Sequence, residues 1–328
     1  MLILKLTRKI VKYILRPFIR DELFDYSNDR TLIEISSKVM SAEDSNNHIY
    51  QLLNNPQPCM VGRLGNTEIN TLIKYDNFIK MNIMEKVYQW SLTSKYPFSS
   101  NCVLVDIFSQ SGFYPVNRSS LAGFKKELVK AMKDVDILGS WIKGENRFIK
   151  YMPEVTSCEL KFLEPYYHKN PWTRALEGKN VLVIHPFALS MENQYKQNRK
   201  NLFKDKHLLP LFNVRFLKSP FTTPGEKHLQ SDWFNTLDSL YNEAVSTDFD
   251  IAILGCGAYG FPLASKLKKY GKKAIHLGGA TQLLFGVKGK RWSKDNFFQK
   301  LFNDFWVYPS QEEIPIDHQG MDQGCYWK

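Results

Sequence analysis

Arg63 and Glu68 are the charged side chains of a glycine-containing turn, CMVGRLGNTEIN (residues 59–70), which follows an apolar run and precedes a predicted helix. An arginine at such a turn can hold a phosphate through paired hydrogen bonds. A glutamate near a helix N-terminus is kept ionised by the helix dipole, and it can bind a cation or accept a proton from a hydroxyl group. Gly62 and Gly65 let the backbone turn sharply and approach a ligand. The alternative is an Arg63–Glu68 ion pair that only holds the turn together.

A second glycine turn, GCGAYG (residues 255–260), lies between a predicted strand and a predicted helix. Its spacing matches the GxGxxG pattern that brings a phosphate to a helix N-terminus. A dinucleotide site would also need a carboxylate about 20 residues later to bind the ribose. The next strand ends instead in AIHLGGA, with His276 and no carboxylate. NAD binding is therefore disfavoured, while a phosphate contact and a purely structural turn both stay open.

A basic segment with further glycines follows, HLGGATQLLFGVKGKRW (residues 276–292). Cationic side chains beside an aromatic ring can clamp a diphosphate and stack on a base. In open α/β sheets, ligands collect where this segment is expected, beyond the end of a parallel strand. The alternative is a solvated basic loop around a buried tryptophan. The residues concerned are Gly278, Gly279, Lys288, Lys290, Arg291 and Trp292.

A histidine and a serine stand out in IHPFALSMENQY (residues 184–195). His185 is at the end of a predicted strand, where it can be a general base, a ligand contact or a structural residue. Ser190 is near a helix start and can equally be a cap. Gln194 and Tyr195 are expected to be ordinary surface or packing residues of that helix.

The elements that must position these side chains alternate along the chain. Apolar and β-branched runs predict strands, and amphipathic spacing predicts helices. This alternation predicts an α/β fold of Rossmann-like type, a mostly parallel sheet flanked by helices, and we expect the turns at 62–65 and 255–260 to face one cleft. The predicted strands are 60–63, 101–108, 136–141, 179–187, 213–220, 249–254 and 274–279. The predicted helices are 30–56, 78–95, 119–135, 188–203, 231–246 and 261–273, with another starting at 68–75.

Local signals refine this outline. Ser119 or Ser120 is the expected N-cap of the helix over 119–135, and Ser231 that of the helix over 231–246. Residues 142–176 are rich in aromatics and prolines and are expected to be less regular. Any boundary inside the main domain is placed at about 142–178.

The composition limits the class of protein. The 328 residues are 43% hydrophobic and 14% aromatic, which excludes global disorder. The formal net charge of +11 favours anionic partners, although no nucleic-acid-binding motif is recognised and nucleic acid is not an expected partner. Five cysteines without a CxxC pair argue against a disulfide framework or structural zinc site and suit a reducing cytosol. No apolar run of about 18 residues predicts a membrane-spanning helix.

Residues 1–20, MLILKLTRKIVKYILRPFIR, predict a basic amphipathic helix. Ile3, Leu6, Ile10 and Ile14 recur at helical spacing, and lysines and arginines fill much of the rest. A signal peptide is not predicted, because there is neither an uninterrupted apolar region nor a small-residue cleavage site. The helix is expected either to lie on an anionic membrane surface, which would make the protein cytoplasmic and peripheral to the inner face of the plasma membrane, or to pack on the body with solvated lysines.

The turn RLGNTE (63–68) fits an RxGxxE pattern. Together with HPFALSMENQY, the segment 253–292 and the terminal GCYW (324–327), it resembles a bacterial family of capsule and surface-polysaccharide proteins of the GT-D glycosyltransferase class. The resemblance covers roughly residues 45–328. It implies a GT-D-like catalytic domain over 23–328 after an amphipathic helix at 1–22, a nucleotide-sugar donor, and a saccharide or lipid-linked acceptor.

In that family the turn is R-x-G-D-x-E, and its Asp-x-Glu pair is implicated in binding a divalent metal and the nucleotide sugar. Asn66 stands at the aspartate position, so this chain offers a neutral carbonyl there in place of a charged oxygen. The resemblance implies a cation, Mn²⁺ or Mg²⁺, on Glu68 with Asn66 or Asp106 as its partner, and Asp136 is a further candidate carboxylate.

The resemblance and the turns together assign catalytic roles to Glu68 and Arg63. They assign donor or phosphate binding to Gly65, Asn66, His185, Ser190, Gly255, Gly257, Tyr259, Gly260, Gly278, Gly279, Lys288 and Arg291. Three functions follow: a nucleotide-sugar-dependent glycosyltransferase, which we favour; an NAD-type oxidoreductase, from GxGxxG alone; and a non-catalytic polysaccharide-assembly protein, which Asn66 keeps open.

Overall fold

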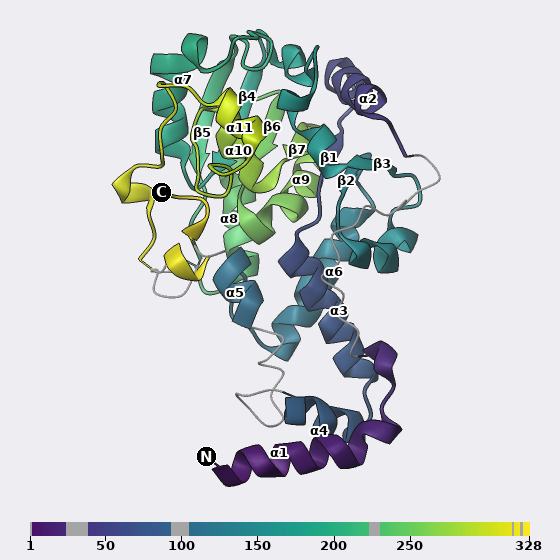
Figure 1. Cartoon of the computed structure of the whole chain (residues 1–328). Coiled ribbons are helices and arrows are strands. Elements are labelled where there is room, and N and C mark those ends of the chain that lie inside the picture. Colours follow the sequence, from purple (N-terminus) through teal and green to yellow (C-terminus); the bar gives the residue numbers. More distant parts are fainter. Residues whose placement is uncertain (1, 24–38, 93–104, 223–229, 317, 322–323) are drawn as a thin grey trace.

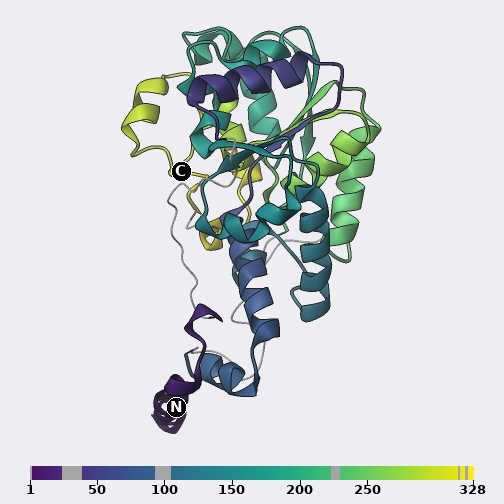
Figure 2. The same cartoon turned by 90° about the vertical axis from the view of Figure 1, so that its right-hand side faces the viewer.

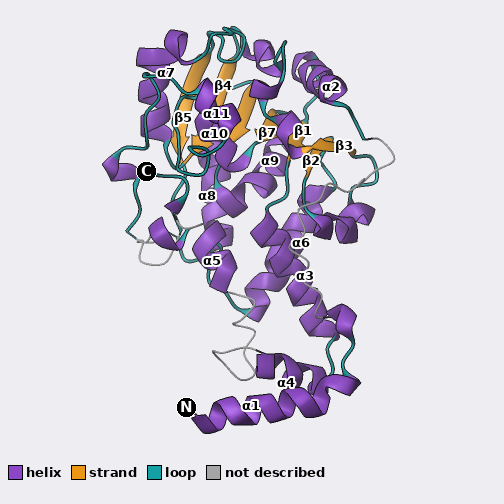
Figure 3. Cartoon of the chain, viewed as in Figure 1, coloured by secondary structure: helices purple, strands orange, loops and turns teal. Residues whose placement is uncertain are grey.

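The structure, a computed structural model, describes residues 2–23, 39–92, 105–222, 230–316, 318–321 and 324–328. Within these residues, seven strands form one all-parallel sheet in the order β3-β2-β1-β7-β6-β4-β5, flanked by helices (Figures 1 and 3). The predicted α/β fold with a mostly parallel sheet is thereby confirmed. The strands are β1 Met60–Gly62, β2 Ile137–Ser140, β3 Thr156–Glu159, β4 Asn180–His185, β5 Asn213–Lys218, β6 Ile251–Leu254 and β7 Lys273–His276.

Each face of the sheet buries its own core, because successive strand residues point to opposite sides. In β6, Ala252 and Leu254 join one core, and Ile251 and Ile253 join the other. The first core is covered by α3 Asn66–Lys80, α6 Arg118–Met132, α8 Trp233–Val245 and α9 Gly260–Lys269. The second is covered by α2 Ala42–Asn54, α7 Ala188–Leu202, α10 Thr281–Leu284 and α11 Asn296–Leu301.

Several predicted elements are wrong in type or extent. Val105–Ser111 forms helix α5, packed against α3, where a strand was predicted over 101–108; a short apolar run does not distinguish a strand from a buried helix. The predicted helix 78–95 is interrupted after α3, and α4 is Ile83–Leu92. Strand β3 and several 3-10 segments lie within 142–176. Residues 30–38, 93–95 and 101–104 of the predicted elements are outside the described residues.

Both predicted helix caps are also wrong, by one to three residues. Asn117 caps α6: its side chain accepts from the Ser120 N–H at 2.9 Å, while the Ser120 hydroxyl accepts from the Asn117 N–H at 3.0 Å. Ser120 therefore occupies the third helical position of a capping box. Asp232 caps α8 by accepting from the Asn235 N–H at 2.8 Å, and the hydroxyl of Ser231 accepts instead from the Asn235 side chain.

The predicted amphipathic helix at the start of the chain is present as α1, Leu2–Leu15. It packs against α4 at the end of the molecule farthest from the sheet, and Figures 1 and 2 both show this pair as an arm below the body. No helix in the described part of the chain combines the length and the hydropathy needed to cross a bilayer. The domain boundaries given above stay predictions, and strands from both sides of residues 142–178 share the one sheet.

Candidate active site

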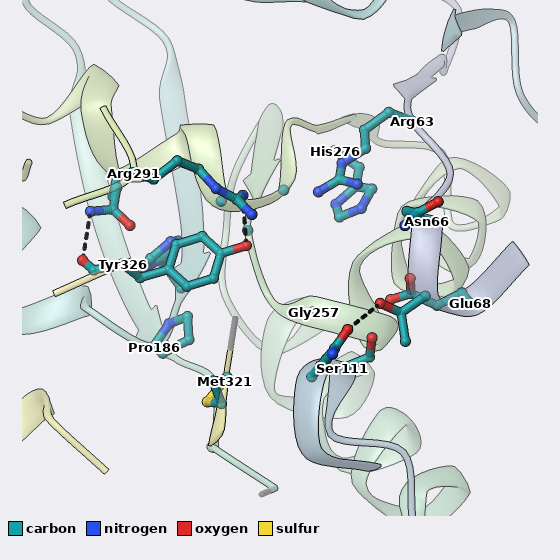
Figure 4. A pocket seen from close by; sticks show the side chains of 18 of the residues that line it. Arg63, Asn66, Glu68, Ser111, Pro186, Gly257, His276, Arg291, Met321 and Tyr326 are labelled. Atoms are coloured by element: carbon teal, nitrogen blue, oxygen red, sulfur yellow. Dashed lines mark hydrogen bonds between the residues drawn. The ribbon is translucent and has the colours of Figure 1, made fainter. Parts of the chain in front are cut away.

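A cavity of about 320 Å³ lies beyond the carboxyl ends of β1, β2, β4, β6 and β7 (Figure 4). This is the edge of a parallel sheet where ligands bind in open α/β folds. The turns after β1 and β6 both contribute to the cavity, so the prediction that these two turns face one cleft is confirmed, and the turn after β7 contributes as well. Its lining includes the predicted residues Arg63, Gly65, Asn66, Glu68, His185, Gly255, Gly257, Gly278, Gly279 and Arg291.

Glu68 is positioned by the first turn of α3. Gly65 is the N-cap residue of that helix, and the Glu68 carboxylate folds back over it. A Cβ on residue 65 would lie 1.8 Å from Oε2 of Glu68, so the group that approaches this glycine most closely is the Glu68 carboxylate. Asn66, one residue into the helix, accepts from the Asn70 side chain at 2.9 Å. The glycine at position 65, which the sequence analysis assigned to ligand binding, is therefore also explained by its contact with Glu68.

Arg63 is held by an aromatic ring and a glycine. Its guanidinium lies over the Trp141 ring at 5.2 Å, and the Trp141 indole donates to the Leu64 carbonyl at 2.9 Å. On the other side, Gly278 has a φ of +64°, and a Cβ there would lie 2.5 Å from an Arg63 nitrogen. Only glycine satisfies both the left-handed backbone and the guanidinium contact. The turn after β7 thus shapes the position of the arginine that follows β1.

Two buried histidines of the lining are neutral and carry their protons on different nitrogens. His276 donates from Nδ1 to the Leu254 carbonyl at 3.3 Å, which leaves Nε2 as an acceptor. In His185, Nδ1 accepts from the Phe187 N–H at 3.0 Å, so the proton is on Nε2. The pKa of each ring is lowered to about 3, in His185 by burial and in His276 by burial first and the charge of Arg63 second. The cavity therefore gains hydrogen-bonding groups without gaining charge from them.

The opposite wall is built by the end of the chain. Arg291 donates to the Tyr326 hydroxyl at 3.0 Å and lies 4.8 Å over its ring, and the ring edge rests against Gly279. Figure 4 shows Arg291 and Tyr326 across the cavity from Glu68 and Asn66, with Arg63 beside His276. Two guanidinium groups and one carboxylate thus line the space from different sides, which suits an anionic ligand.

A buried carboxyl group lies next to Trp141, the residue whose ring packs against Arg63. Glu145 follows β2 and is fully buried; it accepts from the Ser140 hydroxyl at 2.7 Å and from the Trp141 N–H at 3.3 Å. Burial raises the pKa of Glu145 to about 7, while the hydrogen bonds and Arg63 oppose the rise. Glu145 fixes the backbone at Trp141, the residue that supports Arg63.

Several predicted binding residues lie outside the lining. The Ser190 hydroxyl and N–H bond to the buried Glu313 carboxylate. Tyr259 stacks on Trp233 at 5.4 Å with its hydroxyl on Thr222, in the core. Gly260 is buried in α9 under the His276 ring. Lys288 lies over the Tyr308 ring at 5.1 Å. Lys290 is exposed and Trp292 is buried.

Among the described residues, the cation on Glu68 with Asn66 or Asp106 stays a prediction. The described residues contain no group of three or more histidine, cysteine, aspartate or glutamate side chains placed to hold an ion. Glu68 is the one carboxylate of the described cavity lining. Asp136 lies at the amino end of the strands, paired with Lys268 at 2.8 Å and accepting from the Met60 N–H at 2.7 Å, so it is not the missing partner. The side chain of Asp106 is outside the described part of the structure.

Sequence reasoning did not assign Trp141, His276, Gln110 or Tyr326 to the site. Trp141 and His276 had a usable signal, since each lies at the carboxyl end of a predicted parallel strand. Gln110, which accepts from the Thr67 hydroxyl at 2.9 Å, comes from α5, a helix that was predicted as a strand. Tyr326 comes from the irregular end of the chain, which offers no periodic signal.

Comparisons with known proteins give distant matches. No protein-family model and no curated protein matches the sequence. Two solved structures of domain of unknown function 1792, one described as a distinct glycosyltransferase fold, match with TM-scores of 0.42 and 12% identity, over 89% of this chain and 95% of theirs. A third, described as a new glycosyltransferase from Streptococcus sanguinis, matches with a TM-score of 0.36 and 11% identity, over 85% and 96%. Matches this distant carry no argument about function.

Proposed function

We propose that this protein is a glycosyltransferase that takes a sugar from a nucleoside-diphosphate donor and passes it to a surface-polysaccharide or lipid-linked acceptor. The observation that carries the proposal is the meeting of Arg63, Glu68 and Arg291 around one cavity at the carboxyl edge of the sheet. Two guanidinium groups suit a diphosphate, and a single carboxylate in the same lining suits proton transfer. The RxGxxE resemblance of residues 63–68 points to the same reaction.

The step follows from these groups. The bond between the sugar anomeric carbon and the diphosphate oxygen breaks, and a new bond forms to the acceptor oxygen. The acceptor proton goes to the Glu68 carboxylate, while Arg63 and Arg291 stabilise the charge that builds up on the leaving diphosphate. Trp141 and Tyr326 offer aromatic faces for the base or the sugar. The divalent cation stays a prediction, for which Glu68 is the only charged oxygen ligand in the described lining.

A nucleotide-sugar screen by thermal shift, with and without Mn²⁺, tests the proposal on the wild type and on Glu68→Gln. We expect at least one nucleoside diphosphate to stabilise the wild type, by about 2.7 kcal/mol at a hundredfold excess over Kd. Glu68→Gln should keep most donor affinity and lose at least a hundredfold in transfer rate, since general-base catalysis contributes that much. Arg63→Lys should instead weaken donor binding, because the paired hydrogen bonds are lost.

The outcomes separate the competing functions. Wild-type turnover by Glu68→Gln would remove the central assignment. Stabilisation by NAD(H) and not by nucleotide sugars would favour an oxidoreductase, although His276 stands where a ribose-binding carboxylate is needed. A protein that binds the diphosphate but cleaves no donor would be a non-catalytic assembly protein.

A further inference from the structure

The arm formed by α1 and α4 exposes far more apolar surface than its packing requires. Leu6, Ile10, Tyr13 and Ile14 of α1 are 51% to 87% exposed, and Phe18 just beyond the helix is 62% exposed. In α4, Ile83 and Met84 are also exposed. Contiguous exposed apolar residues of this kind mark interaction surfaces.

The residues of α1 divide into three faces. With about 3.6 residues per turn, Leu6, Ile10, Tyr13 and Ile14 share one side of the helix. The opposite side, Arg8, Val11 and Leu15, is partly buried toward α4, and the Arg8 guanidinium lies 5.3 Å over the Trp90 ring. A third face lies between these two sides and consists of exposed lysines, Lys5, Lys9 and Lys12. Within the described residues, the packing on α4 thus leaves the apolar stripe and its basic flank exposed.

We infer that this free face binds the surface of an anionic lipid bilayer. An apolar stripe flanked by lysines, on a helix without a single acidic residue, combines acyl-chain insertion with attraction to anionic headgroups. At 14 residues, α1 is shorter than the roughly 20 needed to span a bilayer, so it lies in the interface. A second copy of the chain is a poorer occupant, because pairing two stripes would bring their lysine flanks together.

The arm is fastened to the body, so that the surface is presented in a fixed orientation. Arg20 forms an ion pair with the buried Glu85 at 2.6 Å and donates to the Lys80 carbonyl at 3.0 Å. The Asn77 side chain donates to the Leu23 carbonyl at 3.1 Å. These contacts join the segment after α1 to the end of α3 and the start of α4. The inference does not depend on the proposed transfer reaction.

Vesicle co-sedimentation of the full chain tests it without donor or acceptor. We expect binding to phosphatidylcholine vesicles that contain phosphatidylglycerol, weak binding to pure phosphatidylcholine, and release by salt. Ile10→Ser with Ile14→Ser should weaken binding at least tenfold. Removing the charges of Lys5, Lys9 and Lys12 with glutamine should weaken it about fivefold per charge, since each contributes about 1 kcal/mol and 1.4 kcal/mol is tenfold.

Controls keep the result specific. Leu211→Ser alters an apolar side chain that is 63% exposed on the body, and it should bind like the wild type. Tyr13→Asp changes a side chain that is 87% exposed, so it leaves the packing intact and should still reduce binding. Equal binding to neutral and anionic vesicles, unchanged binding by Tyr13→Asp, or a dimer that the same substitutions dissolve in the absence of lipid would each overturn the inference.

Discussion

The position of the Glu68 carboxylate depends on the absence of a side chain at residue 65. The Gly65 backbone has a φ of −80° and a ψ of 138°, which any residue adopts, so alanine meets no backbone strain there. The three atoms nearest to its methyl group would all belong to the end of the Glu68 side chain. We therefore expect Gly65→Ala to displace the carboxylate, to change the free energy of unfolding by less than about 1 kcal/mol, and to reduce transfer at least tenfold.

Gly62 provides the matched control for that prediction, within the same turn. A Cβ at Gly62 has its nearest neighbour at 3.4 Å, an ordinary contact. Gly62→Ala should therefore fold and turn over like the wild type. If both alanine variants kept full activity in a donor-hydrolysis assay, the fixed position of Glu68 would have no role in the reaction.

The two buried neutral histidines make stability depend on pH. The unfolded chain binds protons to histidine below about pH 6.5, whereas burial lowers the folded-state pKa of His185 and His276 to about 3. The stability they contribute is present above pH 6.5 and is lost as pH falls toward 3. Between pH 6.5 and pH 5, each of the two histidines should lower the free energy of unfolding by about 1–2 kcal/mol. In His276→Asn, the decrease in the free energy of unfolding between the two pH values should be smaller by the contribution of one histidine. Urea unfolding at both pH values measures it.

Glu145→Gln is the control with the opposite sign. The folded-state pKa of Glu145, raised to about 7, favours the folded state below pH 4.5, and this contribution is lost as pH rises to 7. The glutamine variant should gain stability relative to the wild type at pH 8 and not at pH 4.5. If the free energy of unfolding fell equally from pH 6.5 to pH 5 in the wild type and in His276→Asn, the His276 ring would not be held neutral in the folded protein.

At the level of elements, the sequence predicted the strands that carry the site better than the segments between them. β4, β6 and β7 are apolar runs bounded by glycine or proline turns, so their carboxyl ends were found to within two or three residues. Helix α5 was predicted as a strand because VLVDIF is β-branched and short, and only its packing on α3 decides the outcome. β3 was missed because it is brief and lies among 3-10 segments.

One element shows why side-chain roles were harder to predict than the fold. The N-cap residue of helix α7 makes no side-chain hydrogen bond to the helix. The N–H groups of Leu189 and Ser190 donate instead to the carboxylate of Glu313, which is 124 residues from Leu189 in the sequence. Ser190, predicted as a donor contact or a cap, bonds to the same carboxylate. The Trp327 indole donates to the Glu313 carbonyl at 3.2 Å, so this remote cap also anchors the end of the chain beside the cavity. Contacts over such separations leave no local pattern in the sequence.

At the scale of the whole molecule, helix α3 connects the cavity to the arm. Its first turn holds Glu68, and its last residues, with α4, hold the segment after α1. Fifteen helical residues span about 22 Å. Figures 1 and 2 show α3 running from the arm to the sheet. If α1 lies on a bilayer, α3 therefore holds the cavity above that surface, where we expect it to meet the proposed lipid-linked acceptor.

This geometry predicts that the arm matters for one kind of acceptor and not for the other. Ile10→Ser with Ile14→Ser should reduce transfer to a lipid-linked acceptor in anionic vesicles at least tenfold, because the enzyme is no longer concentrated at that surface. Transfer to a soluble saccharide and donor hydrolysis should be unchanged, since the cavity shares no residue with the stripe. Glu68→Gln should lower transfer to either acceptor at least a hundredfold. Equal losses on soluble and vesicle-held acceptors would mean that the substitutions damage the cavity through α3, and an unchanged vesicle rate would separate membrane binding from the reaction.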